Sequence, residues 1–252
     1  MPGRDPVAPL RAWLAEHAQY LRNPLPAGAG ICMTCRGPAG SSFLRCIPCD
    51  KHFRAAPDSM ADVVAPISYA HAHEQHMHDL RTYKWRTPPE ISRSRLLSLL
   101  VVFLADHGRC LVEAAGGTAP SAAAVVPSTK GRPGLHPLRT LIGDRLGLPW
   151  LPLAPGARPD GQSRTFQRDR FGLNDRAREW VEGRTVLLID DTWTTGSRIQ
   201  SASHTLKAAG AAKVVAVVLG RRVNPVWDEW RPILQKVRDE PFRMDDCPFH
   251  IR

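Results

Sequence analysis

The sequence lacks any apolar run that approaches the roughly 20 residues needed to cross a lipid bilayer, which excludes a transmembrane helix. Its first residues, Met-Pro-Gly-Arg-Asp-Pro-Val-Ala-Pro, also lack the charged and then apolar pattern of a secretion signal. We therefore expect a cytoplasmic protein. In that compartment thiols stay reduced, so the six cysteines are expected to be metal ligands or buried thiols rather than disulfides.

Lysine is scarce, since only six of the 34 basic residues are lysine and the rest are arginine. The formal net charge is nevertheless +10, and such a basic surface attracts nucleic acid and phosphorylated small molecules alike. Charge alone therefore does not choose between these two classes of partner. With 252 residues, 43% of them hydrophobic, the chain is long enough for one ordinary domain and a small appendage.

Four of the cysteines form two C-x-x-C pairs, Cys32 with Cys35 and Cys46 with Cys49. Each pair makes a tight turn that directs two thiolates toward one point, and two such turns complete a tetrahedral sulfur shell suited to zinc. A redox pair or chance spacing would give the same letters. Because four sulfur ligands leave no open position for a substrate, we predict a structural zinc knuckle over residues 31–56.

Short aliphatic runs alternate with helical patterns along the rest of the chain. Strands are expected at 62–69, 122–126, 148–153, 186–189 and 213–219, and helices at 10–21, 91–104 (with Gly108 as its stop), 135–146 and 199–209. Runs such as V-V-A-V-V-L are typical of strands buried on both faces of a parallel sheet. This predicts an α/β fold with a doubly wound, mostly parallel sheet of about four or five strands. The expected domain covers residues 60–222, with an N-terminal helix and linker at 1–30 and a C-terminal tail at 223–252.

The strand at 186–189 ends in two adjacent carboxylates, Asp190 and Asp191. The next six residues, from Thr192 to Ser197, are hydroxylated or glycine at every position except Trp193, and a helix follows them. Carboxylates accept hydrogen bonds from ribose hydroxyls, while backbone N–H groups at a helix start bind phosphate. This stretch therefore predicts a sugar-phosphate site.

Two further segments have the composition of anion-binding loops. The strand at 122–126 opens into a turn at 127–134 in which backbone amides and two cations converge, with Ser128, Thr129, Lys130 and Arg132. Segment 154–164 has no apolar anchor beyond alanine, and Arg164, Arg168 and Arg170 follow within a few positions. This segment is either a lid that closes over a charged ligand or an ordinary solvated connection.

Three other patterns leave alternatives open. The histidines at 71, 73, 76 and 78 form either a metal site or, as we expect, a solvated polar segment or phosphate-facing rim. The basic and aromatic cluster at 81–86 either stacks nucleic-acid bases or packs at a helix entrance. Cys247 and His250 either bind a metal or belong to a docking tail without chemistry.

Residues 186–198, V-L-L-I-D-D-T-W-T-T-G-S-R, resemble the phosphoribosyl pyrophosphate (PRPP) motif of type I phosphoribosyltransferases. With a four-cysteine knuckle before this domain, the chain resembles the ComF family of late-competence and amidophosphoribosyltransferase-like proteins. The resemblance implies that Asp190 and Asp191 contact the ribose 2′- and 3′-hydroxyls and that the loop at 127–132 binds pyrophosphate through Ser128, Thr129 and Lys130. It also implies that the 5′-phosphate is wrapped by Thr194, Thr195, Gly196 and Ser197, with Thr192 at the start of this loop.

The implied activity is transfer of a phosphoribosyl group from PRPP to a nitrogen acceptor with release of pyrophosphate. Mg²⁺ would bridge the pyrophosphate and the ribose hydroxyls, and the catalytic set would be Asp190, Asp191, Lys130, Arg132 and Arg164. The chain departs from the family in having Trp193 where an aliphatic residue is usual and in lacking an R-G-F-N-Q run after the pyrophosphate loop. The family's later signature, Q-x-x-L with R-x-x-N, survives only loosely around residues 167–174. The alternatives are a nucleic-acid-associated protein, with DNA or the competence machinery as partner, and a PRPP-sensing regulator without turnover. A homo-oligomer is compatible with each.

Overall fold

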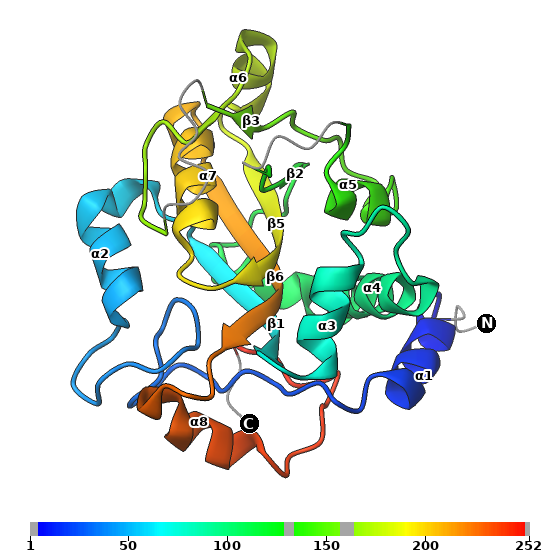
Figure 1. Ribbon diagram of the computed structural model, residues 1–252. Coiled ribbons are helices and arrows are strands. Elements are labelled where there is room, and N and C mark those ends of the chain that lie inside the picture. Colours follow the sequence, from blue (N-terminus) through cyan, green and yellow to red (C-terminus); the bar gives the residue numbers. More distant parts are fainter. Residues whose placement is uncertain (1–4, 129–133, 157–163, 250–252) are drawn as a thin grey trace.

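The computed structural model describes residues 5–128, 134–156 and 164–249, and its centre is a sheet of four strands in the order β1-β6-β5-β2 (Figure 1). All three neighbouring pairs run parallel. The strands are β1 (Val63–His71), β2 (Ala122–Val125), β5 (Thr185–Trp193) and β6 (Lys213–Val223). The expected α/β fold with a parallel sheet is therefore confirmed.

Helices cover both faces of this sheet, and the two-residue period of the strands decides which side chain meets which helix (Figure 1). Leu187 and Ile189 of β5 belong to one apolar cluster, which also contains buried residues of α1 (Ala8–His17), α3 (Gln75–Thr82), α4 (Glu90–Ala114) and α5 (Pro137–Ile142). Leu188 belongs to the other cluster, with α6 (Asp175–Val181) and α7 (Ser197–Ala208). The central strands are thus buried on both sides.

The remaining elements lie around this three-layer core. They are α2 (Ile47–Ala55), the short 3-10 helix η1 (Pro57–Ser59), the antiparallel pair β3 (Ala154–Pro155) and β4 (Phe171–Gly172), η2 (Asp228–Trp230) and α8 (Arg231–Val237). Within the described ranges, none of the helices combines the length and the apolar character that a membrane crossing requires.

Several elements differ from the sequence prediction: the expected helices at 10–21 and 135–146 are shorter, and α2, α3, α6 and α8 were not expected. Segment 148–153 does not form a full strand: it makes one parallel bridge, between Ala123 and Trp150, because the flanking prolines have no N–H to donate to a ladder. Helix α4 does not stop at Gly108 but continues to Ala114. An interior glycine costs a helix only about 1 kcal/mol, and the left-handed conformation that ends this helix occurs later, at Gly116 and Gly117.

Candidate functional site

The two adjacent carboxylates lie at the carboxyl end of β5 and face opposite sides of the sheet. Asp191 continues the side of Leu187 and Ile189, toward α3 and α4, whereas Asp190 continues the side of Leu188, toward α7. The backbone N–H of Asp191 donates to Asp190 Oδ1 at 2.9 Å. The carboxyl ends of parallel strands are where ligands bind in open α/β sheets, so this position is the natural place for a site.

Asp191 is already held by two partners from the segment that follows α3. Its Oδ2 accepts a hydrogen bond from the Tyr83 hydroxyl at 2.5 Å and lies 2.8 Å from Lys84 Nζ. The residue is only 5% exposed. Burial raises the pKa of Asp191, but the charge of Lys84 and the hydrogen bonds from Lys84, Tyr83 and Thr192 outweigh burial and hold the pKa below its ordinary value. Asp191 is therefore a charged, paired anchor.

Asp190 is half-buried and has a different environment. Burial and the neighbouring negative charge of Asp191 raise its pKa to about 7, although Arg198 and Lys84 act in the opposite direction. A carboxyl group with this pKa changes its protonation state near neutral pH. Asp190 is thus the member of the pair whose charge responds to a bound ligand or metal ion.

The turn between β5 and α7 depends on a glycine packed against an indole. Gly196 precedes the first residue of α7 and has φ +81°, a left-handed conformation that side chains disfavour. A Cβ on Gly196 would lie 2.0 Å from Cζ2 of Trp193. Trp193 is 1% exposed, so its indole lies beneath the turn in the core and does not narrow the ligand side. The first N–H groups of α7 have no intrahelical partner and are available to an anion.

Arginine side chains hold the outer side of this turn. The Arg221 guanidinium donates to the carbonyls of Trp193 at 3.3 Å and Thr194 at 3.1 Å. Arg198 donates to the carbonyl of Pro127 at 2.6 Å, which ties the start of α7 to the loop that follows β2. With its carbonyls committed to Arg221, the backbone of the turn is fixed before any ligand arrives.

The other residues predicted for the site have different positions. Thr192 and Ser128 are half-buried at the ends of β5 and β2, and Thr195 donates to the carbonyl of Arg164 at 3.1 Å, with its hydroxyl also 3.3 Å from that of Ser197. Arg164 is exposed beside the turn. The predicted residues Thr129, Lys130 and Arg132 lie outside the described residues.

Two arginines of the expected lid are committed to the body of the protein. Arg168 donates to the carbonyl of Ala55 at 2.7 Å. Arg170 is 1% exposed and donates to the side chain of Gln167 and the carbonyl of Thr165. Of the three arginines proposed for closure over a ligand, Arg164 is the one exposed next to the turn.

Sequence reasoning missed four residues of this site: Tyr83, Lys84, Arg198 and Arg221. The basic and aromatic cluster at 81–86 was interpreted as packing or base stacking, but Tyr83 and Lys84 contact Asp191, 108 and 107 positions away. No local signal predicts this contact, because the segment follows α3 and nothing in its sequence indicates which edge of the sheet it reaches.

The four predicted zinc ligands converge, as the sequence indicated. Cys32 and Cys35 lie in one turn, while Cys46 precedes α2 and Cys49 lies in its first turn. All four are free thiols whose sulfurs lie within 4.8 Å of one another, with 3.7 Å between those of Cys35 and Cys46. Zinc–sulfur bonds of about 2.3 Å in a tetrahedron place the sulfurs about 3.8 Å apart, so the cluster has the dimensions that zinc requires.

The histidine run does not converge on a metal. His76 is buried, contrary to the expected solvated segment, and its Nε2 donates to the carbonyl of Leu219 at 3.1 Å. Burial lowers its pKa to about 4, so it is a neutral core residue. His73 is exposed, and His71 lies 3.6 Å from Glu74. In the part of the chain that the structure describes, no group of three or more potential ligands includes a histidine of this run.

No protein-family model matches this chain, and no curated protein matches it. The interpretation of the site therefore depends on its own geometry and on the motif at 186–198.

Proposed function

We propose that the chain binds PRPP at the carboxyl end of β5 and is a phosphoribosyltransferase-like protein of the ComF type, with a type I phosphoribosyltransferase-like fold. The observation that carries the proposal is the direct sequence of buried strand, acid pair, glycine turn and helix N-terminus from β5 to α7. Few ligands need carboxylates and a phosphate cradle so close together, and a sugar phosphate is one of them.

The two carboxylates would have unequal roles. Because Asp191 is paired with Lys84 and Tyr83, Asp190 is the group with room to accept hydrogen bonds from the ribose hydroxyls. Asp191 would hold the side chains of Tyr83 and Lys84 beside the ribose. The 5′-phosphate would bind the N–H groups at the start of α7 and the hydroxyls of Thr194 and Ser197.

The proposed reaction breaks the bond between ribose C1 and the pyrophosphate oxygen and forms a bond from C1 to a nitrogen acceptor. Pyrophosphate leaves with the electron pair of the broken bond, and the proton lost by the acceptor passes to solvent. Mg²⁺, when bound with PRPP, would neutralise charge on the pyrophosphate, and Asp190 is the carboxylate that would help to hold it. The chain's own residues contribute by orienting the ribose and by fixing the phosphate before reaction.

Calorimetry with Mg²⁺ and PRPP tests binding. The native chain should bind, and the double variant Asp190→Asn with Asp191→Asn should bind at least about tenfold more weakly, because charge-assisted hydrogen bonds to the ribose are lost. Asp62→Asn is the matched control, since Asp62 pairs with Lys207 and Lys213 away from the acid pair. Equal binding by native chain and double variant would exclude this site.

Release of pyrophosphate in the presence of a panel of bases and amines tests turnover. Release that depends on one acceptor would establish a transferase. Tight PRPP binding without release from any acceptor would instead identify a PRPP-sensing regulator that uses the same site.

Nucleic-acid binding is the other candidate, and the net charge of +10 and the exposed side chain of Trp85 favour it. Tyr83 and Lys84 of the same cluster face the acid pair, which leaves less of the cluster for bases. A gel shift with single-stranded DNA over a salt series separates the two functions, because phosphate contacts predict a steep loss of affinity as salt rises.

A further inference from the structure

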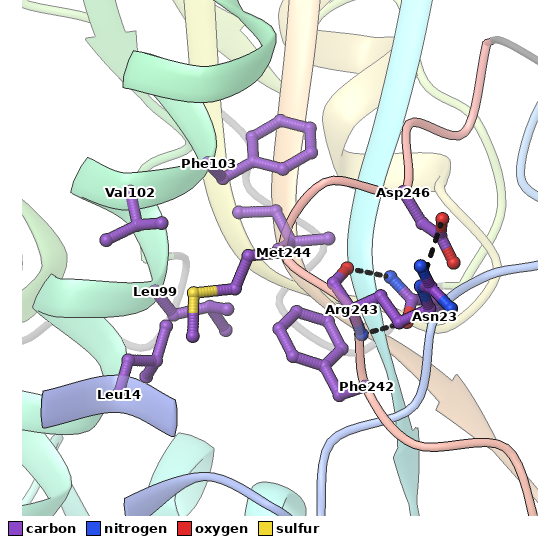
Figure 2. Close-up of a pocket in the computed structure, with 10 residues that line it drawn as sticks. Leu14, Asn23, Leu99, Val102, Phe103, Phe242, Arg243, Met244 and Asp246 are labelled. Atoms are coloured by element: carbon purple, nitrogen blue, oxygen red, sulfur yellow. Dashed lines mark hydrogen bonds and ion pairs between the residues drawn. The ribbon is translucent and has the colours of Figure 1, made fainter. Parts of the chain in front are cut away.

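The C-terminal tail packs against α1 and α4, far along the chain from the acid pair. Figure 2 shows Phe242 and Met244 of the tail beside Leu14 of α1 and Leu99 of α4, in a small pocket between them. The tail is held there by reciprocal hydrogen bonds between the Asn23 side chain and the backbone of Arg243, both 2.8 Å long. The path of the tail over α4 is therefore specified by packing and by hydrogen bonds.

Three potential metal ligands meet where the tail leaves this pocket. His107 and Cys110 lie three positions apart on α4, which places them on one side of the helix, and Cys247 comes from the tail. Their ligand atoms all lie within 4.8 Å of one another. Both cysteines are free thiols.

The imidazole is oriented as it is in metal sites. His107 Nε2 lies 2.7 Å from the carbonyl oxygen of Met244, and because a carbonyl only accepts, Nε2 carries the hydrogen. Nδ1 is then the nitrogen left with a lone pair. Metal-binding histidines commonly donate their other N–H to a backbone carbonyl, which fixes the tautomer and the ring. Here the carbonyl belongs to the same tail that supplies Cys247.

We propose that His107, Cys110 and Cys247 form a second metal site, selective for zinc, that clips the tail to α4. Two thiolates and one imidazole are ligands that zinc prefers. The two cysteines are half-buried, so a water molecule can complete the tetrahedron. The clip also reaches the zinc knuckle, because Arg36 Nη2 of the knuckle donates to the carbonyl of Pro248 at 3.1 Å.

Metal analysis of the full chain, purified without chelator, tests the second site. The native chain should hold about two zinc ions per chain, one in each site, and both Cys247→Ser and Cys110→Ser should hold about one. The control His73→Ala, which removes an exposed histidine outside both clusters, should keep two. Two results would overturn the proposal. In one, both serine variants still hold two zinc ions; in the other, the native chain and both serine variants each hold one.

Hydrogen exchange of the tail gives a second readout, which does not count bound metal. Zinc added to chelator-treated native chain should slow amide exchange over residues 242–249, because a bound tail opens less often. Unchanged exchange in this segment would overturn the clip, and so would a disulfide between Cys110 and Cys247 in the chain isolated under reducing conditions. A slowed tail in native chain but not in Cys247→Ser would support it.

Discussion

Replacing Asp190 by asparagine should make the folded protein more stable at alkaline pH, even though the residue lies in the proposed binding site. Its pKa is raised from the ordinary value of 3.8 to about 7, so the folded state binds a proton that the unfolded state has already released. The stability that this proton provides is fully present below pH 3.8 and is lost as the pH rises through about 7. Asparagine has no such proton to lose.

The magnitude follows from the linkage relation. From about pH 5.5 up to the folded pKa, about 1.5 pH units, the unfolding free energy of the native chain falls by about 1.4 kcal/mol per unit. The loss up to about pH 8.5 is therefore at most about 2 kcal/mol. Asp190 is half-buried and shares its titration with Asp191, so we expect a loss of about 1 kcal/mol in unfolding free energy. The asparagine side-chain oxygen can still accept the hydrogen bond from the N–H of Asp191, so the turn should keep its shape.

Denaturant unfolding of native chain and variant at both pH values is the assay. The difference in unfolding free energy should shift by about 1 kcal/mol in favour of Asp190→Asn at the higher pH. Thiolate and zinc equilibria affect both proteins equally and cancel in this difference. Asp62→Asn is the control with no such shift. Burial raises the pKa of Asp62, but the charge of Lys207 and the hydrogen bonds to this carboxylate outweigh burial, so the pKa lies below its ordinary value. A constant difference, or a shift that favours the native chain, would refute the assignment of a raised pKa to Asp190.

Three further substitutions test other parts of the site by denaturant unfolding. Lys84→Met should destabilise by about 2 kcal/mol because it leaves the buried carboxylate of Asp191 with neutral partners only, and an unchanged stability would contradict the ion pair. Gly196→Ala should cost about 3 kcal/mol through its positive φ and the indole beneath it, whereas Gly108→Ala, in open space inside α4, should gain about 1 kcal/mol. Arg221→Lys should lower the unfolding free energy by about 2 kcal/mol, because an ammonium group cannot donate to all of the carbonyls that accept hydrogen bonds from the guanidinium.

Strands β2, β5 and β6 could be predicted because each contains a short, buried aliphatic run, whereas β1, which includes proline, serine and tyrosine, shows only a loose alternation. Residues 214–219 of β6, V-V-A-V-V-L, are buried at every position, so no polar residue interrupts the pattern. The same local signal misled at 148–153, where apolar residues are present but prolines prevent pairing. Hydrophobicity thus locates strands, and the supply of N–H donors decides which of them join the sheet.

The acid pair and its turn could be located from the sequence because their chemistry is contiguous, from Asp190 to Ser197. The partners of Asp191 could not, since Tyr83 and Lys84 reach it only through the order of the strands. Local pattern does not place the indole of Trp193 either, which is 1% exposed and packs beneath Gly196. Contacts across the sheet are therefore the part of the site that local pattern leaves open.

The four-cysteine cluster is joined to the candidate site more closely than its sequence position suggests. Arg221, at the end of β6, donates through Nε to the carbonyl of Cys35 at 3.2 Å and through Nη1 to the carbonyls of Trp193 and Thr194. Gly37 is required beside it, since a Cβ there would lie 2.4 Å from Arg221 Nη2. A buried guanidinium cannot move without leaving carbonyls unsatisfied on one side or the other. The position of the four-cysteine turn therefore helps to set the backbone that the proposed phosphate would meet.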